Sequence, residues 1–195
     1  MSSQISAPLV DIIKRATQLP GVNQREIAAK ERLANASEQI AVLVDVSGSM
    51  WDPIGVANIC KWQHAKIAVE DILRDCPKVR IVAFSSGFKE VRASADLPGA
   101  GGGTDLAGAF NFIGPWRPRK TIVVSDGIPD DTDAALVAAR RLTGVIDTIY
   151  CGPDGHPAIS FLRSLNPLSG GHHTTWEGAR ELSTTVRGLI AAPKP

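Results

Sequence analysis

One segment constrains the fold of this chain more than any other: a continuous apolar run that ends at an aspartate. Residues 40–44 read Ile-Ala-Val-Leu-Val, and Asp45 follows them directly. A run of this length that is rich in β-branched residues and lacks polar alternation is typical of a central parallel strand buried on both faces. The segment therefore predicts a parallel sheet with helices on both sides.

Strand-like and helix-like segments alternate after this run. Further strands are predicted at residues 79–84, 121–125, 145–150 and 172–176, with a short edge strand at 88–91. Helical spacing of apolar residues predicts helices at about 62–73, 106–113, 130–142, 157–165 and 182–190. This alternation indicates right-handed βαβ units. We therefore expect an α/β fold, doubly wound, with a mostly parallel central sheet flanked by helices on both faces.

The length of the chain fits one domain of this kind. With 195 residues and 44% hydrophobic residues, a single full core is the default expectation. We predict an N-terminal helical extension at residues 1–38, the α/β domain at 39–190 and a flexible tail at 191–195. Within the extension, helical spacing predicts a short amphipathic helix from Ile5 to Ala16 and a weaker helical stretch from Asn23 to Ala36.

Charge, hydropathy and cysteine content exclude several classes of protein. The 21 basic and 20 acidic residues leave a net charge of +1, which offers no broad surface to nucleic acid or an anionic membrane. No segment approaches the roughly 18 unbroken apolar residues of a membrane span. The three cysteines are odd in number and widely spaced, which argues against a disulfide framework. We expect a cytoplasmic protein, and we interpret the basic segment from Trp116 to Lys120 as a solvated loop.

Oxygen-bearing side chains follow the strands at the places where parallel sheets bind their ligands. Such sheets bind ligands beyond the carboxyl ends of their strands, where the strand order reverses. Asp45, Ser47 and Ser49 come directly after the first strong strand, and Asp126 follows a later one. Thr104 ends a glycine-rich loop that opens a helix. We expect these three loops to converge on one point.

Two carboxylates and three hydroxyls form an all-oxygen set of candidate ligands. Oxygen ligands suit Mg²⁺, or Ca²⁺ or Mn²⁺, rather than zinc, which favours histidine and cysteine. The two carboxylates neutralise a divalent cation and leave no excess negative charge at the site. An ion held in this way would keep waters or an open position, which could accept a carboxylate from another protein.

The order of these motifs resembles the metal-ion-dependent adhesion site (MIDAS) of von Willebrand factor A (vWA) domains. Asp45, Ser47 and Ser49 match the family's DxSxS motif, Thr104 its glycine-loop threonine, and Asp126 its Ser-Asp-Gly segment. The resemblance covers about residues 39–190 and implies a Rossmann-like vWA fold. It also implies that the hydroxyls of Ser47, Ser49 and Thr104 face the ion directly or through water, and that Asp45 and Asp126 bind the ion or orient its waters. An Asp or Glu of a partner protein would then complete the shell of the ion. Intracellular members of the family often work beside ATPases.

Alternatives to a metal-dependent interaction module remain open from the sequence. A metal-assisted hydrolase could use the same ion to activate water, but no motif ties a general base to these loops, so we expect no enzyme. A metal-free structural subunit could use the five polar side chains as helix caps. Trp51, just after the first loop, is either an anchor for a partner or a ring packed over the loop.

Overall fold

The structure, a computed structural model, describes residues 26–29, 39–54, 59–176 and 179–192. The chain divides into two compact units, Met1–Arg32 and Leu33–Pro195. In the first unit, residues 26–29 are helical. The helix predicted from Ile5 to Ala16 lies outside the described residues, as do most of the stretch predicted from Asn23 to Ala36 and residues 193–195.

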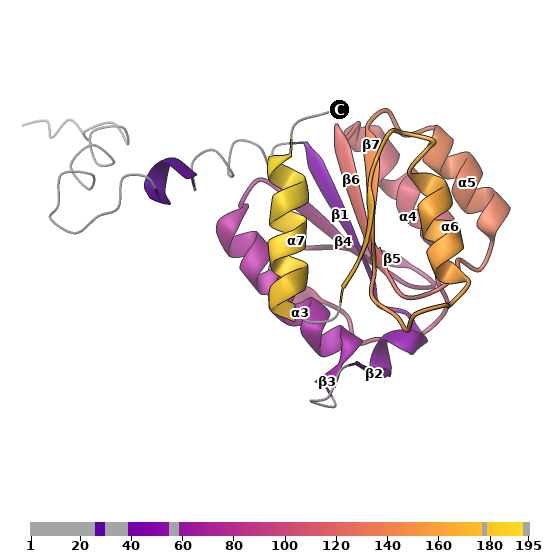
Figure 1. Ribbon diagram of the computed structural model, residues 1–195, viewed down its shortest axis with the longest axis horizontal. Coiled ribbons are helices and arrows are strands. Elements are labelled where there is room, and N and C mark those ends of the chain that lie inside the picture. The colour runs from indigo at the N-terminus through magenta and orange to yellow at the C-terminus, as the bar shows by residue number, and fades with distance from the viewer. Residues whose placement is uncertain (1–25, 30–38, 55–58, 177–178, 193–195) are drawn as a thin grey trace, which may run out of the picture. The chain divides into compact units, whose positions relative to one another are not determined.

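The second unit contains a six-stranded sheet, a small hairpin and five α-helices among its described residues (Figure 1). The sheet strands are β1 Ile40–Asp45, β4 Arg80–Phe84, β5 Phe88–Val91, β6 Lys120–Ser125, β7 Val145–Tyr150 and β8 His173–Thr175. The hairpin strands are β2 Pro53–Ile54 and β3 Ile59–Cys60. The α-helices are α3 Lys61–Asp75, α4 Leu106–Ile113, α5 Thr132–Arg140, α6 Ala158–Leu165 and α7 Ala179–Ala191. Short 3₁₀ helices are η1 Gly48–Trp51, η2 Ser94–Asp96 and η3 Gly114–Trp116.

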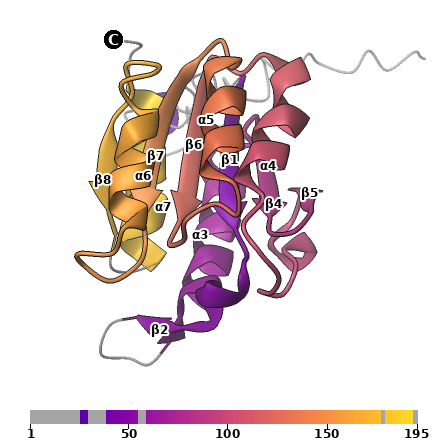
Figure 2. The same cartoon turned by 90° about the vertical axis from the view of Figure 1, so that its right-hand side faces the viewer.

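The sheet is doubly wound, as the sequence predicts. Its strand order is β5-β4-β1-β6-β7-β8, with β5 antiparallel to β4 and the other neighbours parallel. Helices α3 and α7 cover one face of the sheet, and α4, α5 and α6 cover the other (Figures 1 and 2). After β1 the chain forms β4 and β5 on one side of β1, and it then crosses over to form β6 on the other side. The topological switch point, where a crevice for ligands is expected, therefore lies between β1 and β6.

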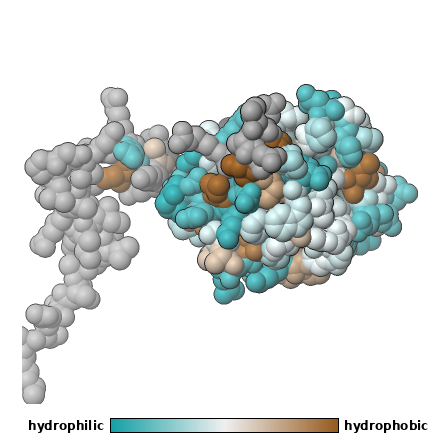
Figure 3. Space-filling model, turned by 90° about the horizontal axis from the view of Figure 1, so that it is seen from below, coloured by the Kyte–Doolittle hydropathy of each residue, from teal (hydrophilic) through white to brown (hydrophobic). Residues whose placement is uncertain are grey.

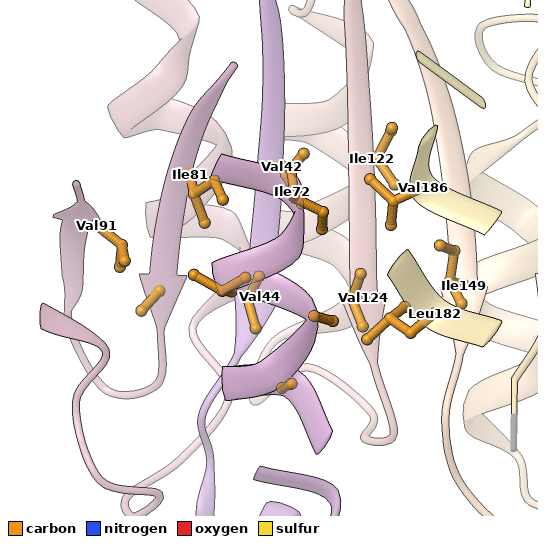
Figure 4. Close-up of a cluster of buried hydrophobic side chains, with 14 of the residues drawn as sticks. Val42, Val44, Ile72, Ile81, Val91, Ile122, Val124, Ile149, Leu182 and Val186 are labelled. Carbon is orange, nitrogen blue, oxygen red and sulfur yellow. The ribbon is translucent and has the colours of Figure 1, made fainter. Parts of the chain in front are cut away.

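Both faces of β1 pack against apolar side chains, which explains its unbroken apolar sequence. Val42 and Val44 lie in the cluster beneath α3 and α7, which Figure 4 shows. Ala41 and Leu43 belong to the second cluster, beneath α4, α5 and α6. All four side chains are at most 2% exposed. Because a parallel strand in this position meets a helix layer on each side, no residue of β1 has a face in water.

One local prediction is wrong. Lys120, expected in a solvated loop, is the first residue of β6 and is buried. Its Nζ lies 3.2 Å from Asp147 Oδ2 and donates a hydrogen bond of 2.6 Å to the Leu189 carbonyl. This buried carboxylate supplies the opposite charge that a buried ammonium requires.

Cys60, Cys76 and Cys151 are free and buried. Among the described residues, no helix combines the length and the apolar character that crossing a membrane requires.

Candidate metal-binding site

The five candidate ligands lie at the carboxyl-end edge of the sheet, at its switch point. Asp45 is the last residue of β1, and Asp126 directly follows β6, the neighbouring strand. Ser47 is the N-cap of η1, Ser49 lies within η1, and Thr104 lies shortly before α4. The β2–β3 hairpin extends beyond the same edge (Figure 2), and the view from below shows a mainly polar surface with small, separate hydrophobic groups (Figure 3).

Hydrogen bonds link the candidate ligands of two different loops. Ser49 Oγ donates to Asp126 Oδ1 at 2.8 Å, and the hydroxyls of Ser47 and Ser49 lie 3.2 Å apart. The backbone N–H of Ser47 donates to Asp45 Oδ1 at 2.7 Å. Asp45, Ser47, Ser49 and Asp126 are thus joined in one hydrogen-bond network by the protein alone.

Gly127 leaves a space that three candidate ligands face. A Cβ atom at Gly127 would lie 3.4 Å from Thr104 Oγ1, 3.8 Å from Asp45 Oδ2 and 4.0 Å from Ser49 Oγ. Two of these oxygens belong to the segment at the end of β1, and the third belongs to the glycine-rich loop. Three of the candidate residues thus face the Gly127 position, and hydrogen bonds join Ser47 and Asp126 to two of them.

The glycine-rich loop that carries Thr104 is fixed against the loop after β1. Gly101 N–H donates to the Val46 carbonyl at 2.8 Å, and Gly48 N–H donates to the Gly102 carbonyl at 3.1 Å. Gly102 has a φ of +80°, a conformation that side chains disfavour. These backbone bonds set the distance between the two loops, and with it the position of the threonine hydroxyl.

Asp130 holds Thr104 in place, a role that the sequence did not indicate. Its carboxylate accepts a 3.0 Å hydrogen bond from Thr104 N–H, and its own N–H donates to the Thr104 carbonyl at 3.1 Å. The sequence predicts Asp130 at the start of a helix at about 130–142, whereas α5 begins at Thr132. Asp131 is the N-cap instead, and accepts from Ala134 N–H at 2.8 Å.

Burial dominates the electrostatics of Asp45. Its side chain is fully buried, and this desolvation raises its pKa from 3.8 to about 6. Hydrogen bonds from Ser125 and Ser47 act in the opposite direction, while the nearby charge of Asp126 raises the pKa further. The Ser125 hydroxyl donates to Asp45 Oδ2 at 2.6 Å. Burial in the folded protein therefore makes ionisation of Asp45 less favourable than it is in water.

Lys61 lies against this network, and the sequence analysis did not single it out. Its ammonium group forms a hydrogen-bonded ion pair with Asp126 Oδ2 and donates to the Ser49 carbonyl at 3.2 Å. Asp52 Oδ2 lies 3.6 Å from the same nitrogen. The lysine is 3% exposed. Its one signal in the sequence is its place directly before an amphipathic helix, which does not distinguish it from an ordinary surface lysine.

Trp51 contacts the glycine-rich loop, as one of the two readings left open by the sequence predicts, and its role as an anchor for a partner stays a prediction. Its indole N–H donates to the Ala100 carbonyl at 2.7 Å, and its ring lies against Trp62 at 5.5 Å. Half of its surface, 52%, stays exposed. The ring therefore braces the glycine-rich loop and also presents apolar surface beside the site.

Solved structures of vWA domains share this fold. A von Willebrand factor type A protein from Catenulispora acidiphila matches with a TM-score of 0.64 at 20% identity, over 80% of this chain and 42% of that chain. Manganese-loaded TRAP protein of Plasmodium vivax matches with a TM-score of 0.55 at 18% identity, over 80% and 74%. The RO (RSR) protein of Deinococcus radiodurans matches with a TM-score of 0.53 at 16% identity, over 98% and 49%. The chain thus has the vWA fold, and it spans less than half of the Catenulispora and Deinococcus proteins.

Comparison of the sequence itself gives no such match. No family model matches the chain, and no curated protein matches it significantly. The likeness therefore concerns the fold.

Proposed function

We propose that this chain is a protein-interaction module that binds one divalent cation, Mg²⁺, Mn²⁺ or Ca²⁺. Asp45, Ser47, Ser49, Thr104 and Asp126 hold the ion, directly or through water. When bound, the ion supplies a positively charged open position that accepts an Asp or Glu carboxylate of a partner protein. The five residues thus form a MIDAS in this proposal.

The convergence of oxygen atoms around Gly127 is the observation that carries the proposal. Thr104 Oγ1, Asp45 Oδ2 and Ser49 Oγ all lie within 4.0 Å of the place where a Cβ would stand. Carboxylates and hydroxyls are ligands for hard cations. Ser49 uses its proton to bond Asp126 and accepts from the Ser47 hydroxyl, which leaves one lone pair for an ion. The chemistry of the set therefore supports a divalent cation.

The environment of the site supports a binding role. Ser49 is exposed although its neighbour Ser47 is buried, so the site opens to solvent on the side of Ser49. Trp51 and Ile128, each within two residues of a candidate ligand or of Gly127, are 52% and 41% exposed. One solved structure with the same fold, the TRAP protein of Plasmodium vivax, is manganese-loaded. Exposed apolar side chains beside a charged centre are typical of protein interfaces.

We propose binding rather than catalysis for this site. The polar side chains that bond its two carboxylates are Ser49 and Ser125, whose protons point at the acids, and Lys61. These groups are used in hydrogen bonds and an ion pair that hold the carboxylates. A general base for metal-assisted hydrolysis needs a free proton-accepting group within reach of the attacking water.

Calorimetric titration with Mg²⁺ and Mn²⁺ tests the metal site. We expect the wild type to bind one ion and Asp45→Ala to lose at least ten-fold in affinity, about 1.4 kcal/mol. Asp71→Ala is the matched control, because Asp71 lies in α3 and bonds the exposed Arg74. Equal affinities of the wild type and Asp45→Ala would contradict the proposal.

Metal-dependent capture tests the partner carboxylate. We expect the immobilised wild type to retain a partner in Mg²⁺ and to release it in EDTA, and Asp45→Ala to retain none. Replacing acidic residues of the captured partner one at a time identifies the carboxylate. Retention that survives both EDTA and Asp45→Ala would contradict the proposed mode of binding.

A further inference from the structure

A buried ammonium group occupies one side of the proposed metal site. Lys61 is 3% exposed, and its Nζ pairs with Asp126 Oδ2, while Asp126 Oδ1 accepts from Ser49. Both oxygens of this carboxylate are therefore engaged within the protein. A divalent ion that binds Asp126 directly or through a water therefore enters a site that already holds the positive charge of Lys61.

The hairpin β2–β3 places Lys61 at this position. Lys61 N–H donates to the Asp52 carbonyl at 3.1 Å, which closes the hairpin and starts α3 directly beside η1. The Ser49 carbonyl accepts from the Lys61 Nζ at 3.2 Å, so the ammonium also bonds the loop that carries two candidate ligands. The position of the charge is thus fixed at both ends of the lysine.

The charges explain why the lysine is stable there. Asp126 is 4% exposed, and a buried carboxylate requires a countercharge. With Asp45 ionised, the two carboxylates and Lys61 sum to a charge of −1, half of what the carboxylates alone offer to an ion. Two cations in one small site repel each other strongly, because the protein interior screens charges less than water does.

We propose that Lys61 is a built-in competitor of the divalent cation. In the metal-free protein it neutralises Asp126 and keeps the loops assembled, and an incoming ion displaces it. This inference rests on the proposed metal site. It makes Lys61 a residue that positions Asp126 and sets the affinity for metal.

Asp52 provides the place to which the ammonium moves. Its carboxylate lies 3.6 Å from Lys61 Nζ and is 67% exposed, so it accepts the lysine without taking part in the network around Asp126. Because Lys61 already pairs with both carboxylates, we expect Asp52 to retain the ammonium when it leaves Asp126. Metal binding thereby changes the charge presented at the base of the hairpin, beside the open face of the site.

Measuring metal affinity and metal-free stability of Lys61→Gln tests the inference. Glutamine removes the charge and keeps a hydrogen-bond donor. We expect Mn²⁺ to bind Lys61→Gln at least ten-fold more tightly than the wild type by calorimetry, and the variant's Tm in EDTA to fall. Lys89→Met, which removes an exposed charge on β5, should change neither quantity. Asp52→Asn, an exposed substitution, should weaken Mn²⁺ binding because the displaced ammonium loses its second acceptor.

The outcomes separate this inference from the proposed function. Wild-type binding with unchanged or weaker binding by Lys61→Gln overturns the inference alone. Binding by Lys61→Gln but not by the wild type supports it in its strongest form, because the lysine then replaces the ion. Absence of binding in both proteins overturns the proposed metal site and the inference with it. If Lys61→Gln is unfolded in EDTA, refolding on addition of Mn²⁺ supports the inference, and failure to refold contradicts it.

Discussion

The hydroxyl of Ser49 donates a 2.8 Å hydrogen bond to Asp126, a residue 77 positions later in the chain. This bond joins the loop after β1 to the loop after β6. A second bond runs from the end of β6 to the end of β1: the Ser125 hydroxyl donates to Asp45 at 2.6 Å. Two adjacent strands at the switch point are therefore cross-linked twice at their carboxyl ends. The protein's own hydrogen bonds assemble the site, so an ion would enter a preformed arrangement.

Gly127→Ala tests the space between the oxygens. The added Cβ makes ordinary contacts of 3.4 to 4.0 Å, so we expect the fold to be unchanged. The methyl group occupies the space that three candidate ligands face, and we expect Mg²⁺ affinity by calorimetry to fall at least ten-fold, about 1.4 kcal/mol. Gly99→Ala, where a Cβ meets nothing within 4 Å, is the control. Undiminished binding by Gly127→Ala would place the ion elsewhere.

Gly103→Ala tests the support of Thr104. A Cβ at Gly103 would collide with the carboxylate of Asp130, which bonds Thr104 N–H. We expect a loss of about 1–3 kcal/mol in the free energy of unfolding, measured by urea denaturation, together with weaker metal binding. Gly101→Ala lies in the same loop, where a Cβ has open space, and should leave both quantities close to wild type. Equal stability of the two variants would show that the loop adapts.

The sequence predicted the sheet and the positions of the candidate ligands because both depend on local signals. The apolar run before Asp45 identifies a doubly buried strand, and residues that directly follow parallel strands share one edge. The order of Asp45, Thr104 and Asp126 along the chain then sufficed to group them. Each of these inferences needs a pattern within a few residues and the general rules of parallel sheets.

The residues that support the site could not be predicted in this way. Lys61 is buried because Asp126, 65 positions away, supplies its countercharge. Asp130 bonds Thr104 rather than α5, and Lys120 is buried against Asp147. In sequence these are ordinary charged residues near helix or strand ends, where solvent exposure or capping is the usual outcome. Their roles arise from pairing over long distances along the chain.

Stability of the metal-free protein should depend on pH through Asp45. Its pKa of about 6 in the folded state lies above the ordinary value of 3.8, so folding favours its protonated form. This contribution is fully present below about pH 4 and is lost as the pH rises through 6, at a cost of about 3 kcal/mol. We expect Asp45→Asn in EDTA to be more stable than wild type at pH 7 and equal to it at pH 4, by urea denaturation. A stability difference that does not change with pH would contradict this.

The buried pair of Lys120 and Asp147 should stabilise the fold only as a pair. Both side chains are at most 4% exposed, and removing one partner leaves the other charge buried and uncompensated. We expect Lys120→Met to lower the free energy of unfolding by about 3–5 kcal/mol, and the added change Asp147→Leu to restore part of the loss. Arg74→Gln, which breaks an exposed ion pair, is the control and should have little effect. Additive losses in the double variant would show that the two charges do not interact.

The most direct test of the central claim is an anomalous difference map from crystals of the wild type soaked in MnCl₂. The account predicts one strong peak beside Gly127, within about 2.0–2.6 Å of at least one oxygen of Asp45, Ser47, Ser49, Thr104 or Asp126. A map without a peak at this edge of the sheet, at Mn²⁺ concentrations that saturate ordinary protein sites, would contradict it.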